Sequence, residues 1–143
     1  MAGIYLNNNV GVKVATVDIS SYITGVTLTQ TFDELEITSM GSTSTFHQFT
    51  KGLESATLQL DFLNDWAASQ VMATLNTAYG TTVAVSMITV KGTIVSATNP
   101  SYQFSILVNN LTPVGTGGPG DMASSSISFT VNTAVVVSPT VAF

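Results

Sequence analysis

The sequence holds a single histidine, His47, and this side chain is the one best suited to act as a general base near neutral pH. A serine, His47 and an acid such as Asp33 could in principle form a catalytic triad, but the G-x-S-x-G motif that exposes a serine nucleophile does not occur. The chain also has no cysteine, which excludes thiolate chemistry. We therefore predict no catalytic residue and no enzymatic activity, and we interpret His47 as packing beside Phe46 and Phe49.

Two other groups of residues resemble ligand sites but lack features that such sites need. Glu34 and Glu36 are two residues apart, so an extended strand places both carboxylates on one face, but a calcium loop needs more oxygen ligands at short spacing. The glycine-rich segment Gly115–Asp121 lacks the G-K-[ST] ending of a phosphate-binding loop, and a strand pattern follows it instead of a helix. We predict no metal site and no cofactor, a solvated acidic face at the two glutamates, and a mobile loop at the glycines.

Most of these side chains belong to one strand, loop, strand unit. Residues 33–37 alternate between acidic and aliphatic side chains, which predicts a strand. Gly41–Gly52 is polar and longer than a tight turn requires, and it carries Phe46 and Phe49, so we expect a long loop with a function. Residues 55–62 alternate strictly between polar and apolar side chains, which predicts a half-buried strand.

The rest of the chain reads as short strands and one helix. The helix is expected from about Asp65 to Tyr79, with Asn64 as its N-cap and Gly80 as its stop, because an apolar stripe recurs there with a period near 3.6. Residues 1–10 are expected to form a loosely tied arm. The further strands are predicted over residues 12–17, 26–30, 81–90, 93–97, 102–108, 127–131 and 134–137.

Together these elements predict a mainly β fold, an antiparallel β-sandwich or barrel of about eight strands with one flanking α-helix. The 143 residues fit a single domain, residues 1–143, with one hydrophobic core. Neither an internal repeat nor a linker interrupts the sequence.

Charged residues make up only 8% of the chain, about a third of the usual share. A surface with so few charges favours a subunit that is covered by copies of itself, so we expect a homo-oligomer. The net charge of −5 and the absence of arginine argue against specific nucleic-acid binding. No secretion signal or membrane-spanning apolar run is recognisable, so we expect a soluble protein that starts in the cytosol and has no membrane partner.

The run from Asp18 to Phe62 resembles the major tail (tail tube) proteins of tailed bacteriophages. Those proteins carry a "disdyv" opening, a strand pair with acidic residues followed by "T.fG", an aromatic-bearing loop, then "GL.d..i.l.f" and a helix. Met40 stands where the family has an aromatic residue, and the loop has no arginine, where relatives often have a basic residue; only Lys51 is near. The matching residues are Asp18, Ile19, Ser20, Tyr22, Ile23, Glu34, Leu35, Ile37, Thr38, Gly41, Phe46, Gly52, Leu53, Glu54, Leu58, Leu60 and Phe62.

The resemblance implies a sandwich that closes into hexameric rings, stacked into a hollow tube through which DNA leaves the capsid without specific binding. It places the protein in the virion tail, assembled in the host cytoplasm beside other tail proteins. The expected contact between rings is the long loop, with Gly41, Phe46, His47, Phe49, Lys51 and Gly52. The expected lining of the lumen is Thr27, Thr29, Ser55, Thr57, Gln59 and Asp61, with Glu34 and Glu36 next.

Two other classes stay open from the sequence. One is another virion protein on a related sandwich, such as a head decoration or tail terminator protein, which would stop at single rings or trimers. The other is a small ligand-binding β-barrel, which would keep a few convergent polar groups around an apolar cavity.

Overall fold

The computed structural model of the chain describes residues 9–41, 43, 45–114 and 118–143. Within these ranges eight strands form one antiparallel sheet, accompanied by one α-helix, which confirms the predicted mainly β fold with a single helix. Residues 1–8 of the expected N-terminal arm lie outside the described residues, as do Gly115 and Gly117 of the predicted mobile loop, whereas Gly118 and Gly120 are described. The elements are β1 (Gly11–Val14), β2 (Val17–Asp18), β3 (Ile23–Glu36), β4 (Phe49–Leu63), α1 (Val71–Ala78), β5 (Thr82–Ile88), β6 (Ser101–Leu107), β7 (Ser124–Val131) and β8 (Val136–Ser138).

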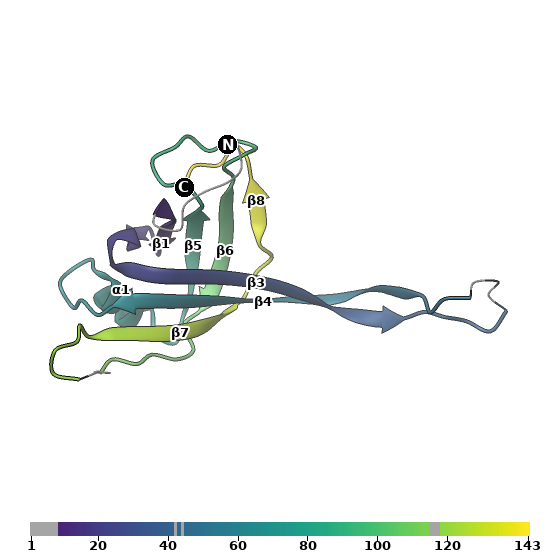
Figure 1. The fold of residues 1–143 in the computed structure, drawn as a ribbon, viewed down its shortest axis with the longest axis horizontal. Helices are drawn as coiled ribbons and strands as arrows, with labels where there is room; N and C mark the ends of the chain where they lie inside the picture. Colours follow the sequence, from purple (N-terminus) through teal and green to yellow (C-terminus); the bar gives the residue numbers. More distant parts are fainter. Residues whose placement is uncertain (1–8, 42, 44, 115–117) are drawn as a thin grey trace.

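The sheet bends so that its strands run in two directions (Figure 1). β3, β4 and β7 run along the molecule, while β5, β6 and β8 run across them. β6 joins the two parts, because it pairs with β5 along its whole length, with β8 at Ser101–Gln103 and with β7 at Ile106 and Leu107. The strand order β2-β1-β5-β6-β7-β4-β3 leaves β2 and β3 at the two edges. The sheet is therefore open, and the 14-residue strand β3 forms one of its edges.

The core lies between the two parts of the sheet and contains residues from both. Leu58 and Leu60 of β4 lie opposite Phe129 and Ile127 of β7, and all four side chains are buried. β5, β6 and α1 contribute the buried residues Val85, Phe104, Ile106, Val71 and Leu75. The alternation predicted for residues 55–62 is confirmed, since the even-numbered residues from Leu58 to Phe62 point into this core.

The helix is shorter than predicted, because it begins at Val71 and not near Asp65. Ser69 has a φ of 63°, a left-handed conformation that an α-helix does not tolerate. Asp65 closes a separate turn, in which its Oδ1 accepts a hydrogen bond of 2.8 Å from the backbone N–H of Ala67. Asn64 is not the N-cap; its side chain accepts a hydrogen bond from the Ser125 hydroxyl and so ties the end of β4 to β7. The predicted stop is confirmed, with Gly80 at a φ of 80° directly after the helix.

Two predicted strands are also corrected. The strand expected over residues 12–17 is a tight hairpin, because Ala15 and Thr16 have φ values of 50° and 68° and reverse the chain between β1 and β2. Residues 93–97 form a loop and not a strand, with a single isolated bridge between Ser96 and Asn99. The buried side chain of Asn99 holds this loop, since it accepts a hydrogen bond from the backbone of Val90 and donates one back, each of 3.1 Å.

The largest difference concerns the long loop. β3 continues without a break from Ile23 to Glu36, and β4 already begins at Phe49. The loop is therefore limited to residues 37–48, and Phe49, Lys51 and Gly52, expected in the loop, lie on a strand. The reason is that these residues pair across the hairpin with β3, a contact that leaves no periodic signal in the sequence.

Candidate functional site

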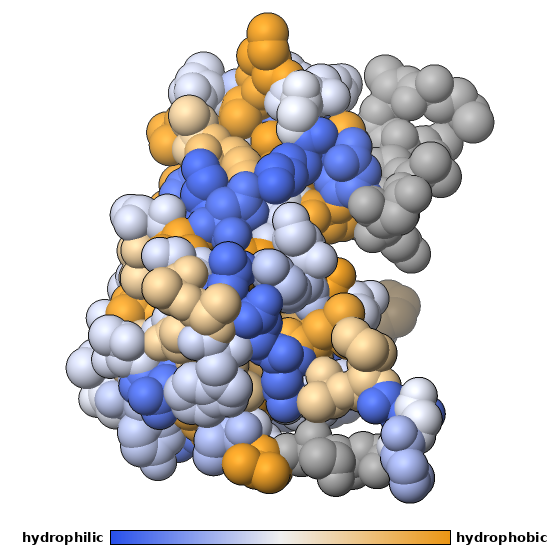
Figure 2. All heavy atoms as spheres, turned by 90° about the vertical axis from the view of Figure 1, so that its left-hand side faces the viewer, coloured by the Kyte–Doolittle hydropathy of each residue, from blue (hydrophilic) through white to orange (hydrophobic). Residues whose placement is uncertain are grey.

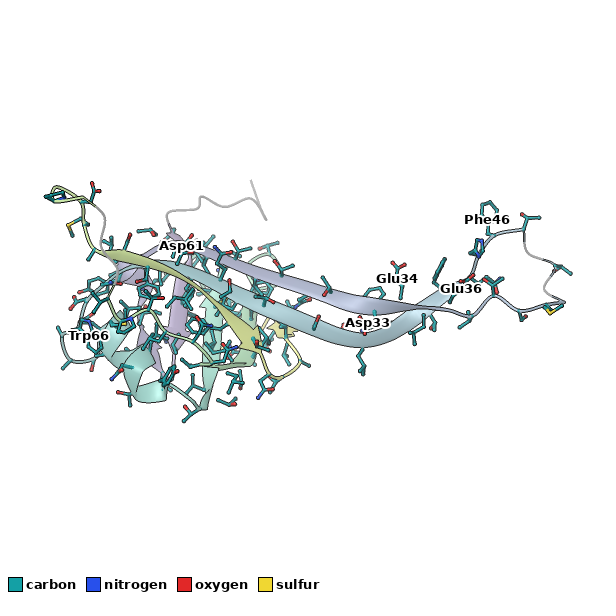
Figure 3. The ribbon with its side chains drawn as sticks, turned by 90° about the horizontal axis from the view of Figure 1, so that it is seen from below. Asp33, Glu34, Glu36, Phe46, Asp61 and Trp66 are labelled. Carbon is teal, nitrogen blue, oxygen red and sulfur yellow. The ribbon has the colours of Figure 1, made fainter. Side chains whose placement is uncertain are left out.

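The β3–β4 hairpin extends far beyond the rest of the molecule (Figures 1 and 3). We call residues 31–41, 43 and 45–55 the arm. β7 pairs with β4 only from Thr57 onward, so among the described residues the strand segments of the arm, 31–36 and 49–55, pair only with each other. A two-stranded ribbon of this length has no core of its own and is marginally stable in water. The arm is therefore the part of the structure that most needs a binding partner.

A β-bulge sits in the middle of the arm. Asp33 faces two residues of β4, Gly52 and Leu53, because the pairing moves from Phe32 with Glu54 to Glu34 with Lys51. A Cβ atom added at Gly52 would lie 2.8 Å from the carbonyl oxygen of Asp33, so glycine is required for this close approach. The bulge turns Lys51 and Glu54 to the same face of the ribbon although they are three residues apart.

Aromatic and charged side chains alternate along this face of the arm, which comprises Phe32, Glu34, Glu36, Phe49, Lys51 and Glu54. The Lys51 ammonium lies 2.5 Å from a carboxylate oxygen of Glu54 and 5.8 Å from the centre of the Phe32 ring. Such exposed contacts contribute well below about 1 kcal/mol each to stability. They hold the side chains in one arrangement on a ribbon that has no packed layer beneath it.

His47 closes the tip of the arm. Its Nδ1 lies 2.5 Å from Glu36 Oε1, and its ring centre lies 6.4 Å from that of Phe49. The packing of His47 beside Phe49, predicted from the sequence, is confirmed. The loop is also closed by backbone contacts, since Ile37 donates to the carbonyl of Gln48 at 2.8 Å and the N–H of Gln48 donates to the Thr38 hydroxyl at 2.7 Å. His47 thus has a structural role at the base of the loop.

The arm exposes an unusual amount of apolar surface. Phe46 is 79% exposed, Leu53 82% and Met40 fully exposed. Large side chains cluster in this way on surfaces that another molecule covers. Figure 3 shows Phe46 near the tip, far from the body of the molecule. The other exposed apolar residues of the arm are Phe32, Leu35, Ile37 and Phe49, each 49–55% exposed.

Hydroxyl side chains cover the outer face of β3, β4 and β7. The register places Thr27 beside Gln59 and Ser128, and Asp61 beside Ser126, all pointing away from the core. Gln59 donates to the Ser126 hydroxyl at 3.2 Å, and that hydroxyl donates to Asp61. Asp61 is the only charged side chain on this face among the described residues of the three strands outside the arm. We call this surface the hydroxyl face; it comprises Thr27, Thr29, Thr31, Ser55, Thr57, Gln59, Asp61, Ser124, Ser126, Ser128 and Thr130.

The structure divides the residues proposed for a lumen into two groups. Six of them, Thr27, Thr29, Ser55, Thr57, Gln59 and Asp61, share the hydroxyl face. Glu34 and Glu36 lie on the arm, at even-numbered positions of β3. Their side chains therefore point to the opposite face of the ribbon from Thr27 and Thr29. The contribution of β7 to the hydroxyl face was not predicted from the sequence. Its signal was present, since Ser124, Ser126 and Ser128 recur with a period of two.

The end of the molecule opposite the arm also exposes apolar side chains. Trp66 is 51% exposed and lies at that end (Figure 3). Figure 2, which views this end, shows hydrophobic side chains on either side of a hydrophilic band. Trp66 directly follows Asp65, so this end carries negative charge close to its apolar surface.

Two groups outside the arm have shifted pKa values. Burial raises the pKa of Asp18, but hydrogen bonds from Lys91 and Ser20 outweigh burial and hold it below its usual value. The Lys91 ammonium lies 2.7 Å from this carboxylate and fixes the β5–β6 loop against β2. Desolvation and the neighbouring carboxylate of Asp65 raise the pKa of Tyr22. Both pairs connect elements of the body and have a structural role.

The described residues hold no group of three or more side chains suited to bind a metal ion. No helix in the described part of the chain has the length and apolar character needed to cross a membrane. A comparison with models of known protein families and with curated protein sequences gave no significant match. The arm and the hydroxyl face are therefore interpreted from their own geometry and chemistry.

Proposed function

We propose that this protein is a structural subunit of a bacteriophage tail tube, which assembles into stacked rings around a channel for DNA. The observation that carries the proposal is the arm. It projects from the body, exposes large apolar side chains along its length and has no partner strand beyond its own hairpin among the described residues. A partner that covers the arm would bury this surface. A second copy of the chain suits this role, because only 8% of its residues are charged.

The strand edges support lateral assembly into a ring. Among the described residues β3 pairs with β4 alone, and β7 pairs with β4 from Ser124 to Thr130 but with β6 at two residues only. The subsheet β3-β4-β7 therefore offers backbone groups on both sides to neighbouring subunits, except at Ser128, whose carbonyl oxygen accepts a hydrogen bond from the Asn110 side chain. Copies joined edge to edge would form a continuous wall, with the hydroxyl face on one side of it.

The chemistry of the hydroxyl face suits the lining of a DNA channel. Hydroxyl groups form hydrogen bonds with water and offer no fixed cations that would hold phosphates. The described part of this face carries one carboxylate, Asp61, and no lysine. A lining of this kind would let DNA pass without specific binding.

Electron microscopy of the negatively stained, purified protein tests the proposal. We expect open-ended tubes. A variant in which residues 33–53 are replaced by Asn-Gly would join Phe32 and Glu54, which face each other across the hairpin, through a two-residue turn. This shortened protein should fold and form at most single rings.

Other results would count against the proposal. Single rings or trimers from the unaltered chain would favour a head decoration or tail terminator protein. A stable monomer at micromolar concentration would contradict tube assembly.

A further inference from the structure

We propose that the tip of the arm binds a hollow on the outer face of β1, β5, β6 and β8 in a second copy of the chain. The inference rests on the proposed self-assembly and identifies the surface that receives the arm. The arm extends away from its own body (Figure 1), so its tip and its own hollow lie apart. Contact between the two surfaces therefore joins different subunits.

The hollow has a volume of about 690 Å³ and is lined by residues of both paired strands and of the C-terminal segment. Its floor consists of small side chains, because Ala84 lies opposite Ser105 and Ser86 lies opposite Gln103 on the face turned away from the core. Ala84 is exposed, whereas its neighbour Val85 is buried. Small residues side by side on two strands leave a recess wide enough for a larger side chain from outside.

Apolar side chains and one lysine surround this floor. Val136 of β8 is 55% exposed on one side. On the other side Phe143 packs against Lys13, whose Nζ lies 4.5 Å from the ring centre and donates to the Phe143 carbonyl oxygen at 2.9 Å. The other lysines, Lys51 and Lys91, are paired with Glu54 and Asp18. Lys13 is thus the lysine that forms no ion pair with an Asp or Glu side chain in the part of the chain that the structure describes.

The arm is complementary to the hollow in charge and in apolar side chains. It has four carboxylates against one lysine, a net charge of −3 with His47 neutral. Phe46 and Phe49 lie near its tip, and Glu36, whose Oε1 lies 2.5 Å from His47 Nδ1, is opposite Phe49 in the register. An aromatic ring fits a recess floored by alanine and serine, and a carboxylate beside it would find the Lys13 ammonium.

The apolar surface around Trp66 is the rival receptor, and charge decides between the two. Asp65 lies next to Trp66, so an acidic arm that docked there would meet a like charge. The hollow offers Lys13 instead. Like charges brought together in an interface disfavour a pairing strongly, so the hollow is the better match.

Cross-linking between two single-cysteine variants tests the inference directly. The natural chain has no cysteine, so each introduced thiol is unique. Thr45→Cys labels the tip and leaves Phe46 and Phe49 intact, while Ala84→Cys labels the floor of the hollow. The two variants are mixed, assembled and treated with a short bifunctional thiol reagent, which tolerates a wider range of separations than a disulfide. In the comparison sample Thr45→Cys is mixed with Ala67→Cys, which labels the rival surface beside Trp66.

We expect a covalent dimer from Thr45→Cys with Ala84→Cys, and at least tenfold less from Thr45→Cys with Ala67→Cys. The reverse ratio, or no dimer from the first pair, overturns the inference, and tubes in the same sample then leave the proposed function standing. A cross-linked dimer without any tube supports the docking surface and contradicts the tail tube proposal.

A substitution that fills the hollow gives a second test. Ala84→Trp places a large ring on the floor and should block docking of the arm, while Asn76→Trp places the same ring on the exposed side of α1 as a matched control. The melting temperatures of both chains show that they fold. The yield of the cross-link between Thr45→Cys and Ser105→Cys should fall at least tenfold when the receiving chain carries Ala84→Trp and should stay unchanged when it carries Asn76→Trp. An equal yield in the two chains would show that the arm binds elsewhere.

Discussion

Gly52 and Asp33 approach each other across the arm so closely that a Cβ atom at position 52 would lie 2.8 Å from the Asp33 carbonyl oxygen. The obstacle is backbone, which cannot rotate away as a side chain does. We expect Gly52→Ala to cost about 1–3 kcal/mol locally, as overpacking does. The cost falls on the arm, so amide hydrogen exchange should rise in residues 31–55 while the body melts as before.

The matched control for this substitution is Gly120→Ala, because a Cβ atom there would meet nothing within 4 Å. Tube yield should drop for Gly52→Ala and stay normal for Gly120→Ala. Unchanged exchange in the arm of the Gly52→Ala protein would show that the bulge accepts a side chain.

Truncation of the tip aromatics should separate folding from assembly. Phe46→Ala and Phe49→Ala each remove a ring that is 79% or 55% exposed, so the subunit should fold normally. If each ring is an anchor between subunits, its loss costs about 2 kcal/mol, and the protein concentration needed for tubes rises roughly 30-fold. Ile94→Ala, at an 86% exposed position in the β5–β6 loop, is the control. Normal tubes from both phenylalanine variants would refute the role of the tip.

Asp61 tests the assignment of the hydroxyl face to the lumen. Asp61→Lys changes the charge by two units per subunit and places a cation on the proposed lining. Tubes should still form, but DNA ejection should slow several-fold, and more so at low salt. Asp61→Asn removes the carboxylate without adding a cation and should leave ejection close to normal. Equal ejection rates for the Lys variant and the natural protein would remove Asp61 from the lining.

The Asp18–Lys91 pair predicts how stability depends on pH. The pKa of Asp18 in the folded protein lies below its usual value of 3.8, because hydrogen bonds from Lys91 and Ser20 favour the carboxylate over the effect of burial. This stability is therefore fully present above pH ~4 and is lost as the pH falls through the lowered pKa. Asp18→Asn should reduce the free energy of unfolding at pH 7 by about 1 kcal/mol or less, since the pair is partly exposed.

Denaturant titrations at pH 7 and near pH 2.5 check this. The difference in the free energy of unfolding between Asp18→Asn and the natural protein should shrink at the lower pH. A gap of the same size at both values would mean that the charge of Asp18 does not contribute. Asp121→Asn, on an exposed turn where no pair with a lysine forms in the described structure, serves as the comparison.

Local sequence patterns correctly predicted features that depend only on residues close together in the chain. The strict alternation of residues 55–62 correctly indicated which side of β4 is buried, because one face of this strand meets the core and the other does not. The stop of the helix at Gly80 was predicted for an equally local reason, since glycine adopts a positive φ without strain. The low charge content likewise indicated a chain that associates with copies of itself, an expectation that the experiments above test.

The sequence by itself thus determined the mainly β fold, the buried face of β4 and the end of α1, since backbone preference and side-chain period act over a few residues. Only the tertiary structure decided where the helix begins, because Ser69 takes its left-handed conformation where the chain turns from β4. It alone also placed Phe49, Lys51 and Gly52 on a strand and assembled the hydroxyl face from β3, β4 and β7. Pairing between strands depends on residues far apart in the chain, and the period of one strand does not specify its partner or its register.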